Sequence, residues 1–326
     1  MALHAVETRR PPDFFLLGVP KAGTTALHAA IAQHPGLYLS PVKEPKYYLC
    51  GDAPPPAYRG PGDAHSQQEW VWRRDDYLGL FDAAPEGVLR GESTPFYLYH
   101  RDARRRIAAD APAARLIVVL RDPVDRAYSN WMHLWMDGLE PVPDLVEAVR
   151  REPERIAAGW APFWHYAGLG RYGEQLADLY TLFDREQVLV LRYRELVDAP
   201  GATLTKVFAF LGVPDRAVAE IPSDNTRGFV EDGLRTRVLG RVIRAGAYAG
   251  QFAAPQHWRA LSAPLVSQLH RGGAPSRPRL TPEQRATLIE PHREDIALLE
   301  EVTGASYDDW LTYRDGGTFA SRRTGA

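Results

Sequence analysis

The chain has 326 residues, which is enough for one large α/β domain or two small ones. Its 39 basic and 41 acidic side chains nearly balance, so the composition indicates no general attraction to nucleic acid. A single cysteine, Cys50, excludes an internal disulfide and is consistent with a reducing compartment. Abundant arginine, alanine, proline and glycine beside scarce lysine are typical of a GC-rich bacterial genome.

The ends of the chain predict a simple organisation. Residues 1–13 lack the apolar core of a signal peptide, and no run of about 18 apolar residues could span a bilayer. We therefore expect a cytoplasmic protein with one domain at residues 13–313. Residues 1–12 and 314–326 are expected to be flexible tails.

The segment at residues 14–35 predicts a buried strand, a tight loop and a helix. Residues 14–17 form an apolar run of strand length, and the following loop contains two glycines. Thr24 and Thr25 stand where a helix N-cap is expected. A glycine loop before a helix is an anion site, because its free backbone N–H groups point outward and the helix dipole favours negative charge.

The rest of the chain alternates between predicted strands and helices. Apolar runs predict further strands at residues 37–39, 88–92, 115–120 and 188–191. We expect helices at residues 70–81, 101–110 (with a solvated face), 144–160, 172–183 and 200–211, from Pro123, and from Thr281 with a break at Pro291. This order predicts an α/β domain with a central parallel sheet flanked by helices, and a ligand at the carboxyl ends of the strands.

Three segments carry weaker patterns. Two prolines predict an extended loop at residues 42–46. Residues 50–69 are rich in proline, glycine and polar side chains and predict an exposed loop or lid. Residues 222–278 show no pattern from which we can predict structure.

The strand at residues 115–120 runs directly into a second polar motif. Asp122 can cap the next helix, and Pro123 suits its first position. Ser129 lies about two turns along that helix, on the same face as Asp122 and Arg126. Arg121 stands at the carboxyl end of the strand, where its guanidinium could bind a phosphate through two parallel hydrogen bonds.

These motifs resemble those of sulfotransferases that use 3′-phosphoadenylyl sulfate (PAPS). PKAGTT at residues 20–25 resembles their 5′-phosphosulfate loop and differs from a Walker A motif, in which lysine directly precedes the Mg²⁺-binding hydroxyl. Arg121 and Ser129 match their 3′-phosphate motif. KEPKYY at residues 43–48 resembles the KEPxFF segment of bacterial and heparan-type members. The resemblance covers residues 13–212 in order, with a looser match at 281–310.

The resemblance implies a P-loop-like sulfotransferase fold and an enzyme that converts PAPS to adenosine 3′,5′-bisphosphate (PAP). It implies that Lys21 stabilises the leaving phosphate and that Glu44 is the general base for the acceptor hydroxyl. We expect Glu92 to orient its neighbours, with a role as the base as the alternative. The residues expected to bind the nucleotide are Lys21, Ala22, Gly23, Thr24, Thr25, Arg121, Ser129 and, as a further candidate, Arg227. No cluster with metal-ligand spacing is present in the sequence, and we expect no metal.

Two other classes of function remain open at this point. A P-loop kinase or NTPase would need a GK[ST] motif and an acidic residue after residues 115–120, where Arg121 stands instead. A non-catalytic nucleotide-binding module would not need both Lys21 and Glu44. The acceptor is expected to be a small molecule or a carbohydrate-containing metabolite of secondary metabolism. Aromatic segments could line its pocket or belong to the core.

Overall fold

The computed structural model describes residues 9–66, 69–216, 229–250, 255–271 and 278–312. Within them, five strands form one sheet in the order β2-β3-β1-β4-β5, and every neighbouring pair is parallel. The strands are β1 (Phe14–Gly18), β2 (Leu37–Leu39), β3 (Leu89–Ser93), β4 (Arg115–Leu120) and β5 (Val188–Arg192). The predicted parallel α/β sheet is therefore confirmed, with each strand within about one residue of its expected bounds.

Strand β1 lies in the middle of this sheet. It pairs with β3 on one side and with β4 on the other, with Phe15 opposite Glu92 and Leu116. The chain leaves β1 toward β2 and β3, and after β3 it crosses to β4 and β5. The loops that follow β1, β3 and β4 therefore diverge at one point on the carboxyl edge, which is where open α/β sheets bind their ligands.

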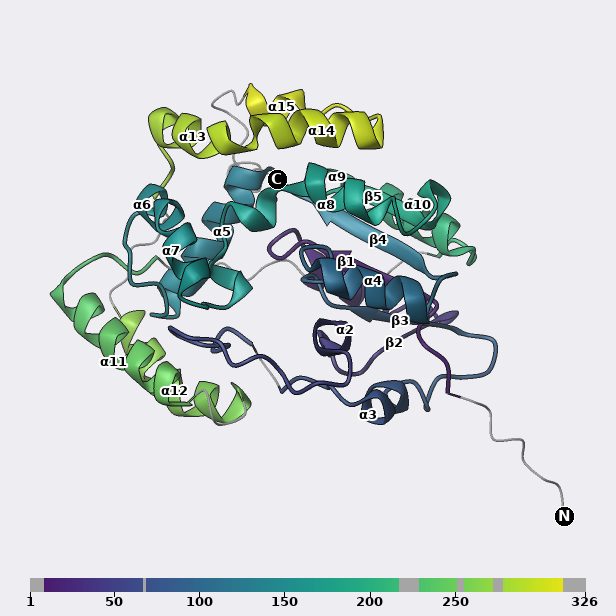
Figure 1. Cartoon of the computed structure of the whole chain (residues 1–326), viewed down its shortest axis with the longest axis horizontal. Helices are drawn as coiled ribbons and strands as arrows, with labels where there is room; N and C mark the ends of the chain where they lie inside the picture. The colour runs from purple at the N-terminus through teal and green to yellow at the C-terminus, as the bar shows by residue number, and fades with distance from the viewer. Residues whose placement is uncertain (1–8, 67–68, 217–228, 251–254, 272–277, 313–326) are drawn as a thin grey trace, which may run out of the picture.

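Helices cover the sheet and extend beyond it (Figure 1). They are α1 (Thr24–Ile31), α2 (Tyr47–Cys50), α3 (Arg74–Gly79), α4 (Arg101–Asp110), α5 (Pro123–Met136), α6 (Leu145–Arg150), α7 (Glu152–Ala157), α8 (Tyr172–Leu179), α9 (Tyr193–Asp198), α10 (Pro200–Leu211), α11 (Leu234–Gly250), α12 (Pro255–Leu269), α13 (Pro282–Ile289), α14 (Arg293–Thr303) and α15 (Asp308–Leu311). In Figure 1, α13 to α15 form one layer along the top, and α11 and α12 form a separate pair at the lower left. No helix among the described residues is long and apolar enough to cross a bilayer.

The two central strands explain why the sheet needs helices on both faces. Every residue of β1 is buried, and in β4 only Arg115 is exposed. Side chains point alternately to the two faces of a strand, so a continuous apolar run is stable only where both faces are covered. This burial places both strands at the centre of the hydrophobic core and holds the carboxyl edge in place.

Several local predictions are confirmed. Asp122 caps α5, and its Oδ1 accepts hydrogen bonds of 2.9 and 3.0 Å from the next helical N–H groups. Thr281 caps α13 in a capping box. The expected break at Pro291 is a short 3-10 turn at Glu290–His292, between α13 and α14.

Other local predictions are wrong. The helix expected at residues 70–81 is limited to α3, and that expected at 144–160 is divided into α6 and α7. Helix α4, in contrast, has its expected bounds and its expected solvated face at Arg101, Asp102 and Arg105, while Arg104 is buried and pairs with Asp178 at 2.7 Å. The helices α11 and α12 occupy a stretch for which we predicted no structure. Most of the expected tails, residues 1–8 and 314–326, lie outside the described residues.

The end of β3 carries a fully buried carboxylate, Glu92. Tyr77 donates a hydrogen bond of 3.1 Å to one of its oxygens, and Thr94 donates one of 2.9 Å to the other. Burial outweighs these hydrogen bonds and raises the pKa of Glu92 to about 7. Because its partners come from α3 and from the loop between β3 and α4, Glu92 organises the polar side of this strand end.

Among the ion pairs of the described residues, the one formed by Glu140 and Arg155 should cost the most free energy to break. Both side chains are buried, and the guanidinium donates hydrogen bonds of 3.0 and 2.6 Å to the two carboxylate oxygens. Arg155→Met should lower the free energy of unfolding by about 3–5 kcal/mol, because it leaves a buried carboxylate unpaired. Arg151→Met, which removes an exposed pair with Glu147, should cost less than about 1 kcal/mol. Urea unfolding at neutral pH measures both changes in the free energy of unfolding. Equal losses in the two variants would contradict the larger contribution that we assign to the buried pair.

The raised pKa of Glu92 predicts how stability depends on pH. The folded state holds a proton on Glu92 up to about pH 7, whereas the unfolded chain releases it near its ordinary value of 4.5. Stability from this group is therefore present below about pH 4.5 and is lost as the pH rises toward about 7. Glu92→Gln should remove this loss, which we expect to be about 1–3 kcal/mol. Urea titrations across this pH range measure the free energy of unfolding of Glu92→Gln and of the unmodified protein. The prediction is wrong if the two free energies change with pH in the same way.

Candidate active site

A cavity of about 220 Å³ lies at the carboxyl edge of the sheet, where the loops after β1, β2 and β3 meet. Its lining combines basic, acidic and aromatic side chains. The lining residues are Pro20, Lys21, Gly23, Thr24, Thr25, Lys43, Glu44, Lys46, His65, Ser66, Pro95, Phe96, His133 and Phe163. The structure therefore brings together the loop at residues 20–25 and Glu44, which are separated in the sequence by a helix and a strand.

The loop after β1 ends in a left-handed turn. Gly23 has φ +81° and forms the N-cap of α1, so the expectation that Thr24 or Thr25 would cap this helix is wrong. A Cβ atom at Gly23 would lie 2.9 Å from the ring of Tyr193, so both the backbone angle and the packing require glycine. Thr24 and Thr25 are the first helical residues, and their N–H groups belong to the turn that has no acceptors within the helix.

Arg121 connects this loop to the ends of β4 and β5. Its Nη1 donates a hydrogen bond of 2.8 Å to the carbonyl of Lys21, and its guanidinium lies 4.7 Å from the centre of the Tyr193 ring. Its Nε is buried and has no hydrogen-bond partner among the described residues. An orphaned donor on a permanently charged group, next to a helix N-terminus, suits an anionic ligand.

The other polar residues of this motif have different positions. Arg126 is fully buried and donates hydrogen bonds of 2.8 Å to Asn130 and 2.6 Å to the carbonyl of Tyr166, so it anchors α5 inside the protein. Ser129 is half-buried on α5, and neither Ser129 nor Arg121 is among the residues that line the cavity. Ala22, which belongs to the loop after β1, is fully buried. Arg227 lies outside the described residues.

Glu44 lines the cavity together with two neighbouring lysines, Lys43 and Lys46. Its Oε1 is 2.5 Å from Lys43 Nζ, and about a quarter (27%) of its side chain is exposed. Its backbone N–H donates a hydrogen bond of 3.0 Å to the carbonyl of Ser93 at the end of β3. Burial favours the neutral acid, but the charges of Lys43 and Lys46 outweigh it and hold the pKa of Glu44 below its usual value. Glu44 is therefore an ionised carboxylate at neutral pH.

Left-handed backbone angles gather at this cavity. Lys21, Glu44 and Lys46 have φ of 70°, 61° and 63°, and among the described residues Asp52 is the one other non-glycine residue with positive φ. The extended conformation expected for residues 42–46 is therefore wrong. Such angles cost about 1–3 kcal/mol each and persist where the surroundings enforce them, which is typical of functional sites.

Three lining residues were not recognised as a group from the sequence. Lys46 is buried, donates a hydrogen bond to Ser66 Oγ and lies 4.9 Å from the centre of the Trp70 ring. The ring of His65 stacks on Phe163 at 4.4 Å, and burial lowers the pKa of His65 to about 4. His65 and Ser66 belong to the segment expected to be exposed, where no periodicity indicates burial.

The aromatic segments divide between the core and the cavity. Tyr47 and Tyr48 are buried in the core, where Tyr47 stacks on Tyr77 and Tyr48 contacts Tyr97 edge to face. Phe96 and Phe163 line the cavity. His28 of α1 and His34, which follows that helix, do not contribute to the cavity lining. His28 Nδ1 lies 2.8 Å from Ser93 Oγ, and the pKa of His28 is lowered to about 4, first by burial and then by Lys43.

Comparisons with known proteins identify relatives of this chain. The family model described as Sulfotransferase family matches residues 12–217. The human heparan sulfate glucosamine 3-O-sulfotransferase 6 is 29% identical over 72% of this chain and 63% of its own length, and the mouse carbohydrate sulfotransferase 15 is 25% identical over 66% and 47%. The chain thus spans about half to two thirds of the length of these curated relatives.

A solved structure agrees with this result over nearly the whole chain. The sulfotransferase from Alicyclobacillus acidocaldarius superimposes with a TM-score of 0.71 at 26% identity, covering 92% of this chain and 99% of that one. The fold, the matched residues and the position of the loop after β1 therefore lead to one conclusion: this chain belongs to the sulfotransferase family.

Proposed function

We propose that the protein is a PAPS-dependent sulfotransferase that sulfates a hydroxyl of a small-molecule or carbohydrate-containing acceptor. The observation that carries this proposal is that Lys21, the first turn of α1 and Glu44 line one cavity. A cationic loop for the donor and a carboxylate for the acceptor are the two parts that an in-line transfer needs. The domain that performs it is residues 13–313.

The donor end is the loop after β1. The N–H groups of the N-cap Gly23 and of the first-turn residues Thr24 and Thr25 suit the 5′-phosphosulfate, together with the ammonium of Lys21. Ala22 shapes the loop. Arg121, whose buried Nε has no partner, suits the 3′-phosphate. Ser129 is the second residue of that subsite, and Arg227 is a further candidate. The bound donor supplies the sulfuryl group and the phosphate leaving group.

The acceptor end is formed around Glu44. The acceptor oxygen attacks sulfur, the bond between sulfur and the bridging phosphate oxygen breaks, and the hydroxyl proton passes to a Glu44 oxygen. Lys21 neutralises the charge that develops on the leaving oxygen. The lowered pKa makes Glu44 a weak base, but one that is ionised at neutral pH and can therefore accept a proton. Lys43 holds the carboxylate in place at 2.5 Å.

The rings around the cavity suggest what the acceptor looks like. Phe96, Phe163, His65 and His133 offer flat surfaces on which a sugar or an aromatic ring can pack. The names of two relatives refer to heparan sulfate glucosamine and to carbohydrate, which supports a sugar-bearing acceptor. The composition and the single cysteine support a bacterial, cytoplasmic enzyme, and we propose that its acceptor belongs to secondary metabolism.

Arg121→Ala should separate the two phosphate subsites. It should weaken PAP binding by about 10–100-fold, because a charge-assisted contact to the 3′-phosphate is lost. AMP lacks that phosphate, so its smaller loss reports only the broken contact between Arg121 and the Lys21 carbonyl. Calorimetry with both ligands in the absence of Mg²⁺ makes the comparison.

Arg293→Ala is the matched control. This exposed arginine at the start of α14 pairs with Glu290, three residues before it, and is not among the residues that line the cavity. It should leave the affinities for both ligands unchanged. Equal losses of PAP and AMP affinity in Arg121→Ala would remove Arg121 from the 3′-phosphate subsite. Tighter binding of ATP with Mg²⁺ than of PAP by the unmodified protein would contradict the whole proposal and favour a kinase or NTPase.

Glu44→Gln should lower kcat by about 10²–10⁴-fold, since the amide keeps the shape of the side chain and cannot accept the proton. PAP affinity should change little, because the phosphate contacts come from the loop after β1. Transfer of label from PAPS to acceptors in a host extract, followed by single-turnover assays on the product found, provides the measurement. Glu92→Gln is the rival variant. Near-full turnover in Glu44→Gln together with none in Glu92→Gln would exchange their roles.

A further inference from the structure

One wall of the cavity is a tight turn at residues 63–66. The N–H of Ser66 donates a hydrogen bond of 2.9 Å to the carbonyl of Asp63, and Ser66 Oγ donates one of 2.6 Å to the Asp63 carboxylate. Trp70 also donates to that carboxylate, at 2.6 Å. The turn presents His65 and Ser66 to the cavity, where they contact Phe163 and Lys46.

The outer side of this wall is held by a residue almost 200 positions away. Arg259, on α12, donates hydrogen bonds of 2.7 Å from Nε to the Ser66 carbonyl and of 2.6 Å from Nη2 to the His65 carbonyl. The two carbonyls belong to consecutive residues, and the planar fork of a guanidinium can reach both at once. A buried carbonyl without a donor would be costly, so this contact fixes the orientation of the wall.

Helix α12 is itself anchored to the domain through α11. The ring of Trp258 covers Gly246, where an added Cβ would lie 2.5 Å from the ring, so the two helices approach closely. Arg244 of α11 donates a hydrogen bond of 3.0 Å to the carbonyl of Gly138, just after α5. Ile243 and Leu269 are buried at the same contact. The pair α11–α12 therefore forms a brace between the end of α5 and the cavity wall (Figure 1).

We propose that Arg259 is a positioning residue for the acceptor, and that α11–α12 determines acceptor recognition through the wall at residues 63–66. This inference rests on the proposed function, because it takes the side of the cavity formed by His65 and Ser66 as the acceptor side. Arg259 makes no described contact with the loop after β1, so its effect is confined to the acceptor. It acts through His65 and Ser66 and does not touch the reacting atoms.

The test compares Arg259→Ala and Arg259→Lys with the unmodified protein, with 4-nitrophenyl β-D-glucosaminide and PAPS as probes. Arg259→Ala should raise KM for the glycoside about tenfold or more, with a smaller change in kcat. Arg259→Lys keeps one of the two hydrogen bonds and should be intermediate. PAP affinity by calorimetry should stay within about twofold in both variants, because the donor subsites are untouched.

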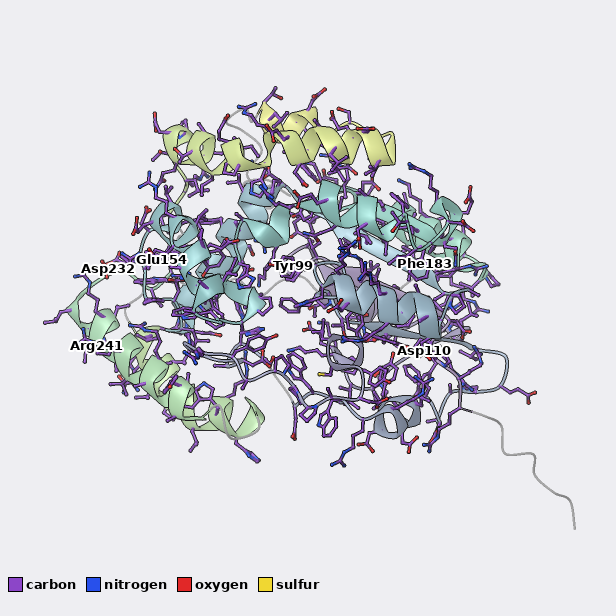
Figure 2. The ribbon with its side chains drawn as sticks, viewed as in Figure 1. Tyr99, Asp110, Glu154, Phe183, Asp232 and Arg241 are labelled. Atoms are coloured by element: carbon purple, nitrogen blue, oxygen red, sulfur yellow. The ribbon has the colours of Figure 1, made fainter. Side chains whose placement is uncertain are left out.

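Hydrogen exchange supplies a readout that needs no turnover. The amides of residues 62–66 should exchange about tenfold faster in Arg259→Ala, while those of α1 keep their protection. Arg241→Ala is the matched control, because Arg241 is exposed on the outer side of α11 (Figure 2), and it should behave as the unmodified protein. Unchanged exchange at residues 62–66, or a loss of PAP affinity that parallels the loss of activity, would overturn the proposal.

The outcome for the proposed function remains separate. If the unmodified protein does not bind PAP, the sulfotransferase proposal fails whatever Arg259 does. If it binds PAP and Arg259→Ala changes neither exchange nor KM, only the positioning role fails. A general loss of folding in Arg259→Ala would increase exchange throughout α11, α12 and α5, and the intermediate behaviour expected of Arg259→Lys would then be absent.

Discussion

The contact between the Arg121 guanidinium and the loop after β1 is the interaction on which the site depends. It joins the carbonyl of Lys21 to the ends of β4 and β5, because the same guanidinium lies on the ring of Tyr193. The Tyr193 ring in turn leaves room only for a glycine at position 23. The ends of β1, β4 and β5 are thus fixed relative to one another by the Arg121 guanidinium, the Tyr193 ring and the absence of a side chain at Gly23.

Charge at the carboxyl edge is arranged in pairs of different strength. Glu44 and Lys43 are partly exposed and remain available to a ligand, whereas Lys46 and Asp63 are held in a buried network. Glu92 lies deeper, and its pKa of about 7 leaves it partly protonated near neutral pH, so it adds less negative charge beneath Glu44 than an ordinary carboxylate would. A cavity of this kind keeps one ionised carboxylate close to its cations without strong repulsion from a second.

The sequence predicts the sheet and the donor loop well, because both depend on local patterns. Continuous apolar runs indicate β1 and β4, and glycine before a helix indicates an anion site. Helices α11 and α12 were missed because arginines and glycines interrupt the first and a proline lies inside the second, and because the burial of α11 depends on distant partners such as Gly138. His65, Ser66 and Arg259 could not be placed because contacts across almost 200 residues leave no periodic signal.

The left-handed angles at Glu44 and Lys46 have a consequence for how this protein can evolve. In a regular strand, neighbouring side chains point to opposite faces, so Lys43 and Glu44 could not line the same cavity. The turn brings three charged side chains of one short peptide to a single surface, and it keeps conformational energy stored in the loop. Glycine at either position would release that energy, so selection for thermal tolerance alone would tend to erase these charges. Their persistence in a lineage would therefore record selection for turnover at the expense of heat resistance.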